Sequence, residues 1–160
     1  MYNHAKSDYI CPICLAINGV ENEDTMIKQE DIFYQDDLIL GIINSKYVEN
    51  NPAHIILVPR EHIENIYDLP DEIGAQIFKL SRIFSIALKK TRKCDGITIR
   101  QNNEPASNQH AFHYHLHIFP RFKNDKFEEL LQNTKVLEPK RREQYAKDLK
   151  NWIKNLNKSD

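Results

Sequence analysis

The sequence has no long uninterrupted apolar segment, and 28% of its 160 residues are charged. A helix that crosses a bilayer needs about 20 predominantly apolar residues, so we expect no membrane partner. The opening residues, MYNHAKSDY, also lack the long apolar core of a secretory signal peptide. We therefore predict a soluble, cytoplasmic protein.

The sequence also has no excess of positive charge. It contains 22 Lys and Arg against 23 Asp and Glu, for a formal net charge of −1. Proteins that bind duplex nucleic acid usually carry a basic field or patch, so we expect no such partner and a local site for any anionic ligand. There are no internal repeats or low-complexity tracts, and the length is typical of a single domain.

Cysteine is scarce, with three residues in the whole chain. Two of them form the segment Cys11-Pro12-Ile13-Cys14. In a reducing compartment this spacing indicates metal or redox chemistry rather than a disulfide. We expect Cys94 to be a buried thiol, so the fold has to be stabilised without a disulfide framework.

Histidine, in contrast, is concentrated in one short stretch. Residues 112–121 read FHYHLHIFPR, which places His113, His115 and His117 at alternate positions. Alternate residues of a β-strand point to the same side, so we predict a strand with one imidazole face. The residues between them are predicted to face the core, and Pro120 is predicted to end the strand.

The remaining pattern predicts an α+β fold, with an antiparallel sheet of about five strands and one long helix packed on it. Residues 27–34 and 38–43 are predicted to form a hairpin, residues 54–59 a buried strand, and residues 97–101 the antiparallel neighbour of the histidine strand. Residues 71–90 show one apolar stripe of helical spacing, formed by Ile73, Ile77, Leu80, Phe84 and Leu88. A second such stripe, Tyr145, Leu149, Trp152 and Leu156, predicts a terminal helix that docks on its own sheet or on a second subunit.

These motifs resemble the histidine triad (HIT) family, whose signature is H-x-H-x-H followed by apolar residues. The segment NSKYVENNPAHIILVPREHIENIYD, residues 44–68, is similar to the nucleotide-binding strands of the family, and CPIC is similar to the zinc half-site of many bacterial members. The resemblance covers residues 9–122 as a HIT domain and leaves residues 123–160 as a charged C-terminal helical extension. It implies a HIT-like fold and a homodimer.

The resemblance also implies a reaction. The middle histidine, His115, is the expected nucleophile, which attacks the α-phosphorus of a purine nucleotide and forms a nucleotidyl-histidine intermediate that water hydrolyses. A main-chain carbonyl is expected to fix its tautomer, and His117 is expected to bridge phosphate and leaving group. The implied function is a nucleotide hydrolase or nucleotidyl transferase that acts on dinucleoside polyphosphates, such as diadenosine tetraphosphate, or on nucleoside phosphoramidates. Histidine rather than glutamine at position 117 favours the hydrolase branches.

Five residues match substrate-binding positions of the family: Asn44, which holds the ribose hydroxyls, and His54, Asn102, Gln109 and His110 near the phosphates. The last three belong to the loop of residues 102–110. Three positions differ from the usual family pattern. His110 stands where a Ser or Thr is common, while Asn108 and Ala53 stand where glycine is common.

A structural zinc ion is the implied cofactor, held by Cys11, Cys14, His62 and His113. Two thiolates and two imidazoles make a closed tetrahedral set, in which the first histidine of the triad is a scaffold for its catalytic neighbours.

The residues leave alternatives open. The three histidines also fit an open zinc site that activates water, or polar side chains on the exposed face of a strand. His54 fits an interior histidine as well as a phosphate contact, Asn44 fits a turn residue, and His4 fits solvated surface. A nucleotide-binding regulatory module with little or no turnover is the alternative function.

Overall fold

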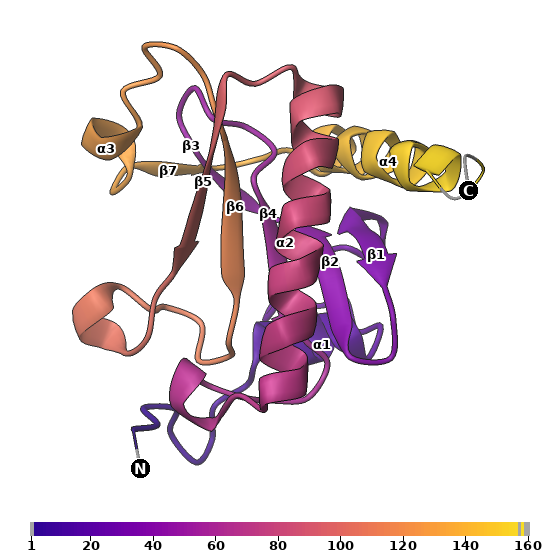
Figure 1. Ribbon diagram of the computed structural model, residues 1–160. Helices are drawn as coiled ribbons and strands as arrows, with labels where there is room; N and C mark the ends of the chain where they lie inside the picture. The colour runs from indigo at the N-terminus through magenta and orange to yellow at the C-terminus, as the bar shows by residue number, and fades with distance from the viewer. Residues whose placement is uncertain (1, 157, 159–160) are drawn as a thin grey trace.

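The computed structural model describes residues 2–156 and 158, and it confirms the expected α+β fold (Figure 1). The central antiparallel sheet has the strand order β1-β2-β4-β6-β5. Its strands are β1 Ile32–Gln35, β2 Ile39–Ile43, β4 Ile55–Pro59, β5 Gly96–Gln101 and β6 Leu116–Arg121; β3 Lys46–Val48 pairs with β7 Thr134–Val136 in a second sheet. The α-helices are α1 Pro12–Ile17, α2 Asp71–Arg92, α3 Phe127–Leu130 and α4 Pro139–Leu156, and short 3₁₀ turns are η1 Gln29–Asp31, η2 Ile66–Asp68 and η3 Pro105–Ser107. Among the described residues, no helix is long and apolar enough to span a membrane.

Helix α2 crosses one face of the sheet (Figure 1). The predicted stripe of five apolar residues on this helix is buried throughout, and it packs against residues of β2, β4 and β6. The opposite face of β2 and β4 is covered mainly by α1 and by Ile27, which form a second apolar cluster. Both faces of these two strands are therefore buried, whereas the same side of β6 carries the half-buried His117.

The predicted hairpin is present, but its first strand begins at Ile32 instead of residue 27. The cause lies in bonds between side chains and main chain just before it. The carboxylate of Asp31 accepts a hydrogen bond from the Lys28 N–H (2.8 Å), and Glu21 accepts one from the Gln29 N–H (2.7 Å). These bonds give the main chain a partner other than a neighbouring strand, so the chain turns before it enters the sheet.

The histidine stretch is only partly a strand, because β6 begins at Leu116 and leaves His113 and His115 before it. The N–H of Tyr114 donates to the carbonyl of Ile63 (2.6 Å), in the loop that follows β4. Alternation still holds for the buried side, where Tyr114, Leu116 and Ile118 pack in the core beneath α2. The prediction that Pro120 ends the strand is wrong: β6 continues to Arg121, and Pro120 lies beyond the part of β6 that pairs with β4, so its missing N–H removes no bond from that ladder.

The C-terminal helix α4 docks on its own domain, against α2, η1 and β1. Ala146 and Leu149 are buried in the main core, and Tyr145 and Trp152 are partly buried beside them. Leu156, the last residue of the predicted stripe, is 43% exposed, so the packed surface ends one turn earlier.

A buried ion pair connects this helix to the start of β1. Arg142 donates through Nε to both carboxylate oxygens of Asp31 (2.9 and 3.0 Å), and its Nη atoms donate to the carbonyls of Leu137 and Met26 (2.6 and 2.9 Å). The two charged side chains are 2% and 1% exposed. Burial nevertheless raises the pKa of Asp31, and the hydrogen bond from Arg142 opposes that rise.

We predict that Arg142→Met strongly destabilises the fold, because it leaves the carboxylate of Asp31 buried without its partner. Removing one member of a buried pair costs about 3–5 kcal/mol. The matched control is Arg141→Met at the exposed neighbouring position. Urea denaturation measures both variants, and an Arg142→Met free energy of unfolding within about 1 kcal/mol of the Arg141→Met value would contradict the prediction.

Candidate active site and metal centre

The two cysteines of the CPIC segment meet two histidines from distant parts of the chain. The ligand atoms of Cys11, Cys14, His62 and His113 all lie within 4.8 Å of one another. Sulfur-to-Nδ1 separations are 3.5 Å between Cys11 and His113, 3.2 Å between Cys14 and His62, and 3.6 Å between Cys14 and His113. Tetrahedral Zn²⁺ with ordinary bond lengths holds S and N ligands about 3.6 Å apart, so the four residues fit such an ion.

Local hydrogen bonds orient the side chains of these possible metal ligands. Cys11 is the N-cap of α1, and its sulfur accepts from the Cys14 N–H (3.4 Å), which places both thiols at the same end of the helix. The Nε2–H of His113 donates to the Pro59 carbonyl (2.9 Å), at the end of β4. This bond assigns the proton to Nε2 and leaves Nδ1 facing the sulfurs, an arrangement typical of histidines that bind metals.

A cavity of about 660 Å³ lies beside this cluster, and six of the residues predicted for catalysis or substrate binding line it. They are Asn44, His54, Asn102, His110, His115 and His117. Gln109 and His113, also predicted for the site, are not part of the cavity wall among the described residues. The structure thus separates the triad: its first member belongs to the cysteine cluster, and the other two face the cavity.

His115 is oriented by the main chain. Its Nδ1–H donates to the carbonyl of His113 (2.7 Å), the kind of bond that the family resemblance implies. Because the proton is held on Nδ1, the lone pair lies on Nε2, which makes no hydrogen bond to a described residue. The side chain therefore presents an unprotonated nitrogen from the wall of the cavity.

A chain of polar contacts joins Asn44 to the triad. The Nδ2 amide of Asn44 donates to the Lys46 carbonyl (3.0 Å) and approaches Nε2 of His54 (2.7 Å), which in turn lies 3.3 Å from Nδ1 of His117. These contacts leave the Asn44 carbonyl oxygen available as an acceptor. His54 is 3% exposed, and its Nδ1 is buried without a partner among the described residues.

Burial keeps these imidazoles neutral at neutral pH. Burial first, and then the nearby His115 ring, lowers the pKa of His54 from 6.5 to about 3. Burial also lowers the pKa of His115, and burial with the charges of His115, His54 and Arg100 holds the pKa of His117 well below 6.5. Neutral imidazole is the form that acts as a nucleophile.

The loop of residues 102–110 forms another wall. Asn102 accepts a hydrogen bond from Nε of Arg100 (2.9 Å) and donates to the Asn108 carbonyl (3.4 Å). Asn108 adopts a left-handed conformation (φ 68°), which asparagine tolerates better than most residues. His110 follows as an exposed side chain at the cavity.

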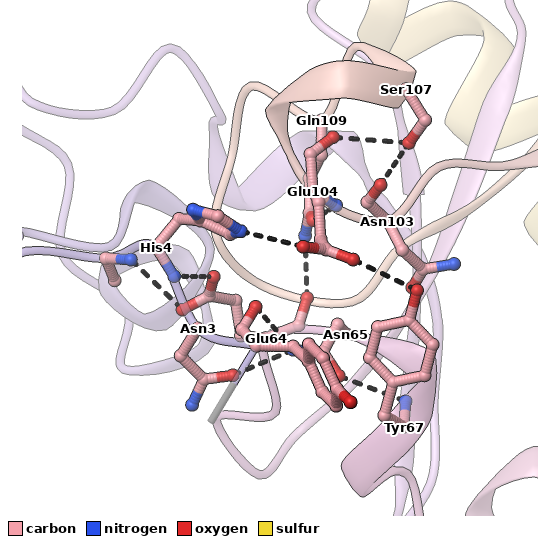
Figure 2. A network of polar contacts seen from close by, with 11 residues as sticks. Asn3, His4, Glu64, Asn65, Tyr67, Asn103, Glu104, Ser107 and Gln109 are labelled. Carbon is pink, nitrogen blue, oxygen red and sulfur yellow. Dashed lines mark hydrogen bonds and ion pairs between the residues drawn. The ribbon is translucent and has the colours of Figure 1, made fainter.

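Gln109 braces this loop from inside (Figure 2). Its Oε1 accepts from the Glu104 N–H and its Nε2 donates to the Glu64 carbonyl, both at 2.6 Å. Both ends of the amide are bonded to main chain and the side chain is 3% exposed, so Gln109 supports the loop. Its contact with substrate stays a prediction.

The N-terminal segment is tied to the same loop (Figure 2). The carboxylate of Glu64 accepts hydrogen bonds from the N–H groups of His4 and Ala5 (2.5 and 3.2 Å), and the His4 ring lies 2.9 Å from the carboxylate of Glu104. Tyr67 donates to the other oxygen of Glu104 (3.1 Å). His4, expected to be only solvated surface, therefore takes part in a network that holds the loop.

Several cavity residues escaped the sequence prediction. Arg100 lies opposite His117 in the β5–β6 register, and that pairing is the signal that could have revealed it. Leu131, Gln132 and Thr134 come from the charged C-terminal region, where no local motif marks them.

Ala53, at the position where glycine is common in the family, is buried with φ 69°, a conformation that is strained for alanine.

The depressed pKa of His54 predicts a pH-dependent stability. The unfolded chain binds a proton on this residue near pH 6.5 and the folded chain only near pH 3, so acidification below 6.5 favours unfolding. Between pH 7 and pH 5 the contribution is about 2 kcal/mol. His54→Gln is expected to lose less stability than the wild type over this range in urea denaturation. Equal losses in the two proteins would contradict the prediction.

Comparison with known proteins identifies the family. The sequence model of the family described as "HIT domain" matches residues 26–124 of this chain. An uncharacterised HIT-like protein of Saccharolobus solfataricus is 32% identical over 113 residues, 71% of this chain and 77% of that one. A bis(5'-adenosyl)-triphosphatase of Dictyostelium discoideum is 28% identical over 100 residues, 62% and 66% of the two chains. The crystal structure of a Zn-bound histidine triad family protein from Mycobacterium smegmatis superposes with a TM-score of 0.74, at 25% identity over 94% of this chain and 97% of that chain. The family model covers more than half of the chain, and the histidine stretch and the sheet agree with it. The chain therefore belongs to the HIT family.

Proposed function

We propose that the protein hydrolyses purine nucleotides that carry a leaving group on the α-phosphate, with His115 as nucleophile. The observation that carries this proposal is the bond from His115 Nδ1 to the His113 carbonyl, because it leaves Nε2 unprotonated at the cavity wall. A cavity of about 660 Å³ is within the size range of small-molecule sites.

The proposed reaction has two displacements. In the first, the Nε2 lone pair attacks the α-phosphorus, a P–N bond forms, and the bond from phosphorus to the leaving group breaks and gives its electron pair to that group. In the second, water attacks the same phosphorus, one proton of that water is released, and the electrons of the P–N bond return to Nε2. The products are a nucleoside monophosphate and the regenerated imidazole.

Other residues of the cavity support this reaction. The free carbonyl oxygen of Asn44 can accept from a ribose hydroxyl, and the Asn102 amide and His110 ring can donate to phosphate oxygens. His117 adjoins His115, with 4.7 Å between ring centroids, and its proposed role is to contact both phosphate and leaving group. Donors held in place before the reaction stabilise the charge that develops on the phosphoryl group.

We propose that Cys11, Cys14, His62 and His113 hold a structural zinc ion. The support is the donor set and the S-to-N separations of 3.2–3.6 Å. Four protein ligands leave no open position for substrate or water. Such an ion would attach α1 to the segment before β6 and keep His115, two residues from His113, in place.

The proposal includes a homodimer. Its support is the exposed edge strand β5, where Ile99 is 46% exposed, and the outer side of α2, where Phe78 is 73% exposed. Apolar side chains of this size on an open strand and a neighbouring helix favour contact with a second subunit.

We predict that His115→Asn abolishes turnover while nucleotide binding persists. Asparagine lacks the nucleophilic nitrogen, and loss of a nucleophile typically lowers kcat by about 10³-fold or more. The assay measures AMP release from diadenosine tetraphosphate and from adenosine 5'-phosphoramidate, and calorimetry measures AMP binding. Affinity within about threefold of the wild type is expected, since the asparagine removes little of the cavity wall.

Full activity in His115→Asn would rule out the covalent mechanism. A wild-type protein that binds AMP but releases none from either compound would instead favour a regulatory nucleotide-binding module.

The zinc proposal predicts that Cys11→Ser lowers both metal content and stability. The purified wild type should contain one zinc per chain by elemental analysis, and the variant should lose it together with roughly 10 °C of melting temperature. Cys94→Ser is the matched control, because this buried thiol stands outside the cluster and should leave the zinc content unchanged. Absence of zinc from the wild type, or equal zinc content in all three proteins, would contradict the proposal.

A further inference from the structure

Arg100 is a half-buried cation in the cavity wall. It lies on β5 directly opposite His117 of β6, so both side chains are on the same face of the sheet. Its Nε donates to Asn102 (2.9 Å), and no ion pair joins it to a carboxylate of the described residues. The two Nη atoms of the guanidinium therefore remain available to a ligand.

The strand order places this cation at one end of the site. Asn44 follows β2, His54 precedes β4, His117 lies on β6 and Arg100 lies on β5, and these strands are neighbours in the order β2-β4-β6-β5. A nucleotide whose ribose contacts Asn44 and whose α-phosphorus is at the triad then extends its leaving group toward β5. In this orientation of the nucleotide, Arg100 lies at the end of the cavity that holds the leaving group.

The charges around the cavity indicate what kind of leaving group this end accepts. Of the described residues that line it, Lys46 and Arg100 are the cationic ones and Asp24 is the acidic one. Lys46 is exposed and lies two residues from Asn44, at the ribose end. A guanidinium binds phosphate oxygens through charge-assisted, often paired hydrogen bonds, whereas an amine that leaves as a cation is repelled by it.

We infer that Arg100 selects nucleotides whose leaving group is itself a phosphate chain, so that dinucleoside polyphosphates are preferred over phosphoramidates. This inference rests on the proposed function and narrows its substrate class. In the first displacement the bond between the α-phosphorus and the bridging oxygen breaks, and the departing oxygen keeps the electron pair. Arg100 stabilises the resulting oxyanion without a proton transfer. An amine leaving group requires a proton, and half-buried His117, whose pKa lies well below its usual value, is a poor source of one at neutral pH.

The test compares two substrates in four proteins. We would measure kcat/KM for diadenosine tetraphosphate and for adenosine 5'-phosphoramidate with the wild type, Arg100→Met, Arg100→Lys and the control Arg82→Met, an exposed arginine on α2. Arg100→Met should lower kcat/KM for the polyphosphate roughly 10- to 100-fold and change the phosphoramidate value less than about threefold. Arg100→Lys should recover part of the loss, and Arg82→Met should match the wild type.

An equal loss on both substrates would overturn the inference, because it would mean that Arg100 acts only by positioning Asn102. A wild-type preference for the phosphoramidate would overturn it as well. Ligand binding tests the inference independently if the protein turns out not to hydrolyse either substrate. In a His115→Asn background, adding Arg100→Met should weaken binding of diadenosine tetraphosphate about tenfold and leave AMP binding unchanged, and unchanged binding of both would overturn the inference without any turnover.

Discussion

The site depends on one main-chain hydrogen bond, from Tyr114 to the carbonyl of Ile63. It holds the residues before β6 against the loop after β4, outside the regular ladder that begins at Leu116. The His113 side chain then faces the cysteines of α1, while its carbonyl accepts a hydrogen bond from the Nδ1–H of His115.

The sequence predicts those parts of this arrangement that depend on neighbouring residues in the chain, and it misses those that depend on residues far apart in the chain. Alternation predicted the buried side of the histidine stretch, and helical spacing predicted the whole stripe of α2. The start of β6, the start of β1 and the burial of Gln109 follow from bonds to residues outside the local pattern. Arg142 and Asp31 are 111 positions apart, and each alone has the appearance of surface charge. Such a pair has no periodicity, so only the folded chain reveals it.

Some of the backbone strain lies beside the cavity. Of the seven non-glycine residues with positive φ among the described residues, Ala53 precedes His54, and Glu104 and Asn108 belong to the loop of residues 102–110. A left-handed conformation costs an alanine about 1–2 kcal/mol relative to glycine. The surrounding structure must supply that energy: Ala53 is buried, and Gln109 accepts from the Glu104 N–H in the loop and donates to the Glu64 carbonyl outside it. Packing and these hydrogen bonds thus maintain the geometry at positions that are not glycine.

Both ends of the chain take part in the site, although the family match covers residues 26–124. The CPIC segment precedes that range and supplies half of the cysteine–histidine cluster. Residues 131–134 follow it, and the pairing of β7 with β3 brings them to the cavity beside Asn44 and Lys46. Helix α4 then fixes this returning segment through Arg142, which donates to the Leu137 carbonyl as well as to Asp31. The β3–β7 pairing and the bond from the Leu137 N–H to the Ser45 carbonyl hold the same segment, so Arg142 connects the C-terminal helix to a part of the chain that the small sheet already ties to the cavity wall.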